Sequence, residues 1–189
     1  MHSQTIDSLM SLLRAHLRVN EPLALEDECK LLAQYVSIMR MRNRLDIGFT
    51  VDLPEQFRSI KVPRLLLQPL VENSIVHGMK RNIPDPQICV KVRESEEGII
   101  IHVTDNGKGI DEEDAKELNE QLNNKTEVQE DKGVGLFNVL RRLKLSFGEQ
   151  ARFTVAPNMP DGFVCTLVIP VSADYSGKEM RYAENNACG

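Results

Sequence analysis

The apolar residues between Ile6 and Leu17 recur every three or four positions, which predicts a helix. The segment Asn20-Glu21-Pro22 interrupts this pattern, because proline disfavours helical conformation in the residue before it. A second helix is predicted from about Leu25 to Asn43, with acidic residues in its first turn and arginines in its last, as the helix dipole favours. Its apolar face consists of Leu25, Cys29, Leu32, Val36 and Met39. This face packs either on the domain core or on a partner, and we expect the first helix to pair with another chain.

The middle of the chain predicts a strand followed by a strongly apolar helix. Residues 45–52 carry apolar side chains at every second position, which is typical of a half-buried strand. A helix is predicted over residues 64–77, and Pro63 suits its first turn. A helix this apolar lies against a sheet, so its few polar residues should face something specific. They are Gln68, Glu72, Asn73 and Ser74.

The second half of the chain predicts four strands and two helices. The strands are residues 88–92, 99–104, 153–155 and 163–169, and the first two form an antiparallel hairpin. The helices are residues 111–123 and 133–147, and the charged segment 124–132 between them is expected to be mobile. The order of elements predicts an α+β two-layer sandwich: a mixed five-stranded sheet with helices on one face, preceded by one or two N-terminal helices.

Composition agrees with a folded domain and excludes several classes of protein. The 189 residues suit one domain with a short appendage, and 41% hydrophobic with 27% charged residues is typical of soluble globular proteins. No apolar run approaches the length of a membrane-spanning helix, and Asp7, Arg14 and His16 interrupt any signal-peptide pattern, so we expect a soluble chain. A net charge of -5 argues against a nucleic-acid surface. The four cysteines form no CxxC pair, which disfavours zinc and favours reduced thiols in the cytoplasm.

The apolar helix carries adjacent acid and amide side chains. Asn73 and His77 lie four positions apart and share a face, and Glu72 is next to Asn73. Magnesium prefers oxygen ligands, usually few from the protein and the rest from water and phosphate. The Asn73 carbonyl oxygen suits this role, and the Glu72 carboxylate suits binding or orienting a water. The alternative is a structural amide at Asn73 that caps a neighbouring strand.

A glycine-rich loop follows the strand 99–104. Asp105 lies at the strand end, where its carboxylate can accept a hydrogen bond from an exocyclic amine such as that of adenine. Gly107 and Gly109 allow positive φ angles and a close approach of the backbone to a ligand. The alternative for Asn106 to Gly109 is a simple tight turn.

A second glycine cluster, Gly133-Val134-Gly135, opens the last predicted helix. Free backbone amides and the helix dipole favour a phosphate there. The segment does not match the P-loop motif, and it does not follow a strand as the dinucleotide-binding fingerprint must. Both of those nucleotide-binding classes are therefore excluded.

The three motifs together resemble the ATP-binding superfamily of gyrase, MutL, the heat-shock chaperone and the histidine kinases. Residues 70–78 (LVENSIVHG), 105–110 (DNGKGI) and 133–136 (GVGL) are similar to its N, G1 and G2 boxes, in that order. Within it, the chain looks most like the LytS/YesM-type sensor histidine kinases. The supporting segments run from Leu25 to Glu28, from Pro63 to Asn73 and from Gly133 to Val139, and the whole resemblance covers roughly Ile6 to Pro170.

This resemblance implies a Bergerat-type domain that binds ATP and Mg²⁺ and phosphorylates a histidine. By motif position, Asn73 would hold the metal with Glu72 as a base or water-orienting group, and Asp105 would read adenine. Further implied nucleotide contacts are His77, Lys80, Gly107, Gly109, Ile110, Gly133, Val134, Gly135, Leu136, Asn138 and Thr166. Thr166 would support Asp105 or adenine through its hydroxyl. Many family members begin that strand with a Gly-Thr pair, whereas Phe163 follows Gly162 here.

The family's acceptor histidine lies in a His-Phe-Leu-Phe-Asn motif, which this sequence lacks. His2, His16 and His102 have other surroundings, so we expect a catalytic fragment that does not autophosphorylate alone. We expect residues 1–22 to be a remnant of the dimerisation and phosphoacceptor helix, 23–171 the ATP-binding domain and 172–189 a polar tail. The resemblance implies the parent kinase's phosphoacceptor helix, a response regulator receiver domain and a second copy as partners, and no nucleic acid. It also implies a cytoplasmic domain of a parent protein anchored in the cell membrane.

Two other functions remain open from the sequence. A MutL- or gyrase-like ATPase would use Glu72 to activate water, although the chain lacks the long second domain of such proteins. A non-catalytic nucleotide-binding or dimerisation module would depend on the N-terminal helices instead.

Overall fold

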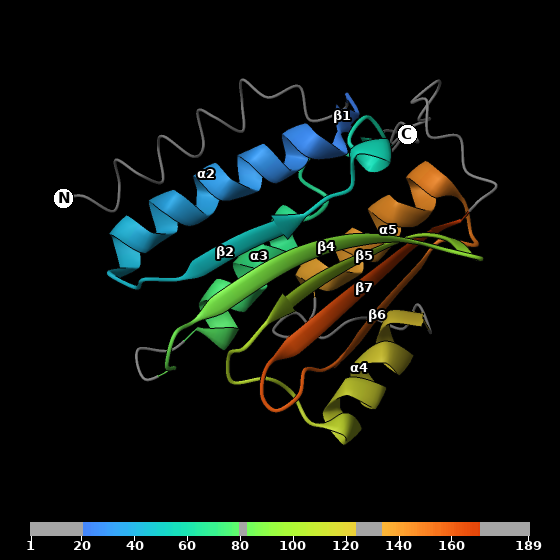
Figure 1. Cartoon of the computed structure of the whole chain (residues 1–189). Helices are drawn as coiled ribbons and strands as arrows, with labels where there is room; N and C mark the ends of the chain where they lie inside the picture. The colour runs from blue at the N-terminus through green and yellow to red at the C-terminus, as the bar shows by residue number, and fades with distance from the viewer. Residues whose placement is uncertain (1–20, 80–82, 124–133, 171–189) are drawn as a thin grey trace, which may run out of the picture.

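The computed structural model describes residues 21–79, 83–123 and 134–170. Its central element is a mixed five-stranded sheet (Figure 1). In chain order its strands are β2 (Gly48–Asp52), β4 (Gln87–Ser95), β5 (Gly98–Asp105), β6 (Arg152–Pro157) and β7 (Phe163–Pro170). Their order across the sheet is β2-β4-β5-β7-β6, with β2 parallel to β4 and every other pair antiparallel. The predicted α+β sheet is therefore confirmed.

One face of the sheet forms the core with the helices. In β4, Ile88 and Val90 are buried while Lys91 between Val90 and Val92 is exposed, as the alternation of side chains along a strand requires. The helices are α2 (Leu25–Asn43), α3 (Gln68–Asn73), α4 (Glu112–Asn123) and α5 (Val134–Phe147). Fully buried side chains from both layers meet in one cluster, among them Leu32, Leu70, Leu143, Ile88, Ile101 and Leu167. No helix in these ranges is long and apolar enough to cross a membrane.

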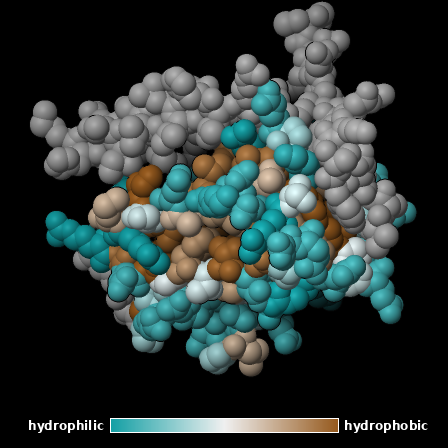
Figure 2. Space-filling view, turned by 45° about the horizontal axis from the view of Figure 1, so that its top comes forward, coloured by the Kyte–Doolittle hydropathy of each residue, from teal (hydrophilic) through white to brown (hydrophobic). Residues whose placement is uncertain are grey.

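Helix α2 has the predicted bounds and buries its predicted face on the core. Leu25, Leu32 and Val36 are at most 2% exposed. The helix also carries apolar side chains away from this face: Ile38 is half-buried and Met41 is 73% exposed. Figure 2, in which the top of the molecule in Figure 1 is turned toward the viewer, shows hydrophobic residues lying between hydrophilic ones. The main apolar face of α2 is therefore buried against the domain core.

The helix predicted over residues 64–77 is the main departure from expectation. It begins only at Gln68, because Leu65 has a φ of 60° and residues 64–67 form turns. After Asn73 it widens into the π-helix Ser74–Gly78, in which the amide of Met79 bonds to the carbonyl of Ser74 five residues back. A short antiparallel pair, β1 (Leu23–Ala24) with β3 (Lys61–Val62), was also not predicted, because two-residue strands leave no periodicity.

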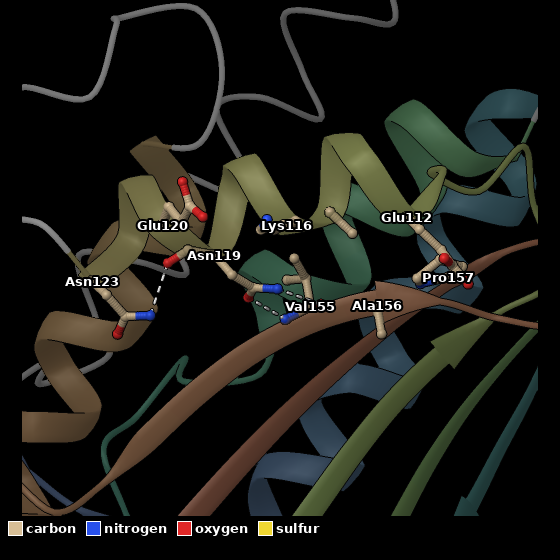
Figure 3. A pocket seen from close by; sticks show the side chains of 9 residues that line it. Glu112, Lys116, Asn119, Glu120, Asn123, Val155, Ala156 and Pro157 are labelled. Carbon is tan, nitrogen blue, oxygen red and sulfur yellow. Dashed lines mark hydrogen bonds between the residues drawn. The ribbon is translucent and has the colours of Figure 1, made fainter.

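Helix α4 covers the edge strand β6. The Asn119 side chain accepts the Val155 amide at 2.9 Å and donates to the Val155 carbonyl at 2.8 Å, so it replaces a neighbouring strand (Figure 3). Beside it lies an open groove of about 440 Å³, lined by α4 and the end of β6. No residue of the three sequence motifs lines this groove. The predicted mobile segment that follows α4 lies outside the described residues, as do both chain ends.

Candidate nucleotide-binding site

The end of the π-helix packs directly against the loop after β5. A Cβ atom on Gly107 would lie 2.6 Å from the backbone of Gly78, so only glycine permits this approach. The amide of Lys108 then donates to the Gly78 carbonyl at 3.0 Å. Two motifs that are almost thirty residues apart in the sequence are thereby joined at one place.

Asp105 is held at this junction by hydrogen bonds, among them one from Ser74 and one from Gly107. It is 3% exposed, its Oδ2 accepts the Ser74 hydroxyl at 2.6 Å and its Oδ1 accepts the Gly107 amide at 2.9 Å. Burial raises the pKa of Asp105 above its ordinary value of 3.8, although these donors oppose the rise. A Cβ on Gly78 would lie 3.2 Å from Oδ1, so the glycine lets the π-helix lie close to the carboxylate. A fixed acceptor of this kind suits recognition of an exocyclic amine.

The turn between β6 and β7 closes on the same loop. Asn158 donates from Nδ2 to the Asp105 carbonyl at 2.8 Å. Gly162 has a φ of 125°, and a Cβ there would lie 1.9 Å from the same carbonyl oxygen. Gly162 thus contributes close packing even though Phe163, not threonine, follows it. This contribution was not predicted from the sequence.

Glu72 and Asn73 end α3 immediately before Ser74, so the expected metal ligand lies one residue from the contact with Asp105. Both side chains are half-buried, and His77 is exposed near the end of the π-helix. The described residues contain no group of three His, Cys, Asp or Glu side chains that could hold a metal. An amide oxygen with an adjacent carboxylate nevertheless fits Mg²⁺, which takes most of its ligands from phosphate and water.

Helix α5 packs against α3. Gly135 is exposed, and nothing lies within 4 Å of the position of a Cβ there, which leaves space for a ligand at this helix start. Asn138 is exposed one turn further on, whereas the Leu136 side chain is 5% exposed and belongs to the core. Gly133 and Lys80 lie outside the described residues. Gly109 and Ile110 lie half-buried in the loop after Asp105.

Thr166 does not support Asp105, contrary to expectation. It pairs in register with His102, and its Oγ1 lies 3.1 Å from His102 Nδ1. Asp105 pairs with Phe163, so alternation along the strands places Thr166 on the opposite face of the sheet. Ser74 was not predicted as the hydrogen-bond partner of Asp105. The available signal was a polar residue directly after Asn73 on an otherwise apolar helix.

Residues 60–173, more than half of the chain, match the family model described as "Histidine kinase-, DNA gyrase B-, and HSP90-like ATPase". The chain belongs to this ATPase family. The superfamily resemblance predicted from the three motifs is therefore confirmed.

Two sensor kinases are similar to this ATPase-family chain over most of its length. Sensor histidine kinase YesM of Bacillus subtilis is 26% identical over 169 residues, which are 89% of this chain and 27% of the relative. Sensor protein kinase HptS of Staphylococcus aureus is 27% identical over 168 residues, which are 88% of this chain and 32% of the relative. The chain spans less than a third of the length of these relatives.

Two solved histidine kinase domains have a similar fold. The ATP-binding domain of PrrB from Mycobacterium tuberculosis gives a TM-score of 0.54 at 18% identity, over 79% of this chain and 95% of that domain. The catalytic domain of histidine kinase ThkA gives a TM-score of 0.55 at 13% identity, over 79% of this chain and 94% of that domain. At these identities the similarity shows a shared fold.

Proposed function

We propose that the chain is the ATP-binding catalytic domain of a sensor histidine kinase, which transfers the ATP γ-phosphoryl group to a histidine on a phosphoacceptor helix. The observation that carries this proposal is the junction of Ser74, Asp105 and Gly107, with Asn73 next to Ser74. The similarity to YesM and HptS over nearly the whole chain supports it.

In this proposal the chain acts mainly by positioning the nucleotide. Asp105 accepts a hydrogen bond from the adenine amine, and the amides at the start of α5 face the phosphates. The Asn73 oxygen would hold Mg²⁺, with Glu72 beside it orienting a water or accepting a proton. Bound Mg²⁺ supplies neutralisation of the phosphate charge.

The partners follow from the same assignment. The acceptor helix would belong to the parent kinase, the relayed phosphoryl group would pass to a response regulator receiver domain, and the parent would act as a dimer with this domain in the cytoplasm. The names of the two relatives as sensor kinases support this scheme. It also includes anchoring of the parent in the cell membrane.

Calorimetric titration with Mg-ATP tests the site. Asp105→Asn should weaken binding at least about tenfold, since a hydrogen bond to a charged group is worth about 1.5–3 kcal/mol. Asn73→Asp should alter the Mg²⁺-dependent part of the affinity, and Asp46→Asn, at an exposed acid elsewhere, is the control. Unchanged affinity in both site variants would refute the assignment.

The position of Glu72 beside Asn73 favours one second function, an ATPase in which this carboxylate activates water. Steady ATP hydrolysis that disappears in Glu72→Gln, without transfer of phosphate to an added acceptor helix, would support it. Absence of any adenine-nucleotide binding would point instead to a non-catalytic module.

A further inference from the structure

Glu28 is a buried acid far in sequence from the three motifs. It lies in the first turns of α2 and is 1% exposed; within the described ranges the other buried polar side chains are Ser74 and Asp105 at the candidate site. A buried carboxylate is costly unless hydrogen bonds compensate it. A specific structural task for Glu28 is therefore expected.

Both carboxylate oxygens of Glu28 hold the turn that precedes α3. Oε2 accepts the Leu65 amide at 2.9 Å, and Oε1 accepts the Leu67 amide at 3.1 Å. The guanidinium groups of Arg64 and Arg142 add favourable charge near the carboxylate. This carboxylate therefore connects α2 to two residues, Leu65 and Leu67, that follow Glu28 by 37 and 39 positions in the sequence.

The turn that contains Leu65 is strained and is held from both sides. Leu65 has a φ of 60°, a left-handed conformation that is unfavourable for a non-glycine residue. Its amide bonds to Glu28, and its carbonyl accepts Arg142 Nη1 from α5 at 3.3 Å. Such strain persists only where the surroundings over-determine the conformation. Glu28 and Arg142 together provide that constraint.

The turn sets the start of the helix that ends in Glu72 and Asn73. Helix α3 has no side-chain cap of its own, and Leu67 is both a partner of Glu28 and the acceptor for the amides of Leu70 and Val71. Leu67, Leu70 and Val71 are at most 1% exposed, so this short helix is tightly packed. A displacement at its start would reach Asn73 at its end, rather than being absorbed between them.

We infer that Glu28 is a positioning residue for Asn73: it ties the first turns of α2 to the start of α3, so that the placement of α2 determines the placement of the metal ligand. The inference rests on the proposed function, because it takes Asn73 as the ligand of Mg²⁺. It adds a mechanical link between α2 and the nucleotide site.

The test compares nucleotide affinity with and without Mg²⁺ in the intact chain. A non-hydrolysable ATP analogue is titrated by calorimetry in Mg²⁺ and in EDTA. Glu28→Gln should reduce the Mg²⁺-dependent gain in affinity by up to about tenfold, the lower end of what loss of a direct partner of a metal ligand causes. Its affinity in EDTA should fall less, because Asp105 is also held by the Gly107 amide of its own loop. Glu28→Asp, which keeps the charge, should show a smaller loss, and it replaces Glu28→Gln if that variant does not fold.

A matched control and a double variant separate positioning from general destabilisation. Glu26→Gln removes the same charge from the same helix, at a side chain that is 42% exposed, and should match wild type. In an Asn73→Ala background, Glu28→Gln should cause no further loss of the Mg²⁺-dependent gain.

Two results would overturn the inference. One is an unchanged Mg²⁺-dependent gain, whether affinity stays the same or falls equally in Mg²⁺ and EDTA, and the other is additive effects with Asn73→Ala; each would refute the role of Glu28 while leaving the proposed function standing. If wild type bound no adenine nucleotide, the proposed function would fail and this inference with it.

Discussion

The Ser74 hydroxyl lies 2.6 Å from Asp105 Oδ2 and donates a hydrogen bond to it. This contact joins the helix that carries Asn73 to the end of β5, which carries the candidate base-reading acid. The residue expected at the metal and the residue expected at adenine are thus linked through one buried side chain. Their relative positions are fixed before any ligand binds.

Ser74→Ala should destabilise the protein and weaken nucleotide binding. Removal of the hydroxyl leaves a buried carboxylate oxygen without its donor, which costs about 1–3 kcal/mol. Urea unfolding and Mg-ATP titration measure the two effects. Ser59→Ala, at an exposed serine, is the control, and equal stability and affinity of the two variants would contradict the role of Ser74.

The stability of wild type relative to Glu28→Gln should depend on pH. Burial raises the pKa of Glu28 above its ordinary value of 4.5, although the Leu65 and Leu67 amides and the charges of Arg142 and Arg64 oppose the rise. The folded state therefore binds the proton more tightly, and the stability this provides is lost as pH rises from 4.5 through the folded pKa. Across that window the unfolding free energy of Glu28→Gln should gain on wild type by up to about 1.4 kcal/mol per pH unit.

Urea unfolding at a series of pH values checks this slope. The lost hydrogen bonds change the offset between the two proteins, whereas only titration changes the slope. Parallel pH profiles would show that the pKa of Glu28 is the same in the folded and unfolded chains.

Gly135→Ala should separate stability from binding. Nothing lies within 4 Å of the position of the new Cβ, so the fold accepts the methyl group, and the helix gains up to about 1 kcal/mol in stability. The same methyl group would obstruct a phosphate at the start of α5 and weaken Mg-ATP binding. Thermal unfolding and calorimetry measure the two properties, and retained affinity would exclude close phosphate contact at this residue.

Thr166→Val should leave nucleotide affinity within about twofold of wild type, since its hydroxyl lies on the face of the sheet away from Asp105. Loss of the contact with His102 should cost no more than about 1.5 kcal/mol of stability. A large loss of affinity in the same titration, without a matching loss of stability, would restore Thr166 to the site.

Local pattern was enough to predict the sheet and its helices, and to select Asp105 as a candidate. Alternating apolar residues identified the strands, and glycines beside an acid identified the loop that contacts Gly78. Thr166 was misplaced because the face of a residue depends on strand register, and one residue of shift reverses it. The sequence gives no local signal for that register.

The contacts of Glu28 and the late start of α3 share another cause. Both depend on Leu65, whose left-handed conformation no local propensity favours and which is held by α2 and α5. Contacts across 37 or 77 residues leave no periodicity in the sequence. Only the assembled structure reveals them.

The contact of Asn119 with β6 affects how readily the protein aggregates at high concentration. Without it, β6 would present the Val155 amide and carbonyl to solvent, and exposed strand edges recruit strands from other molecules. One amide on α4 therefore protects the chain against edge-to-edge aggregation. Separation of α4 from β6 would therefore promote self-association before the core unfolds.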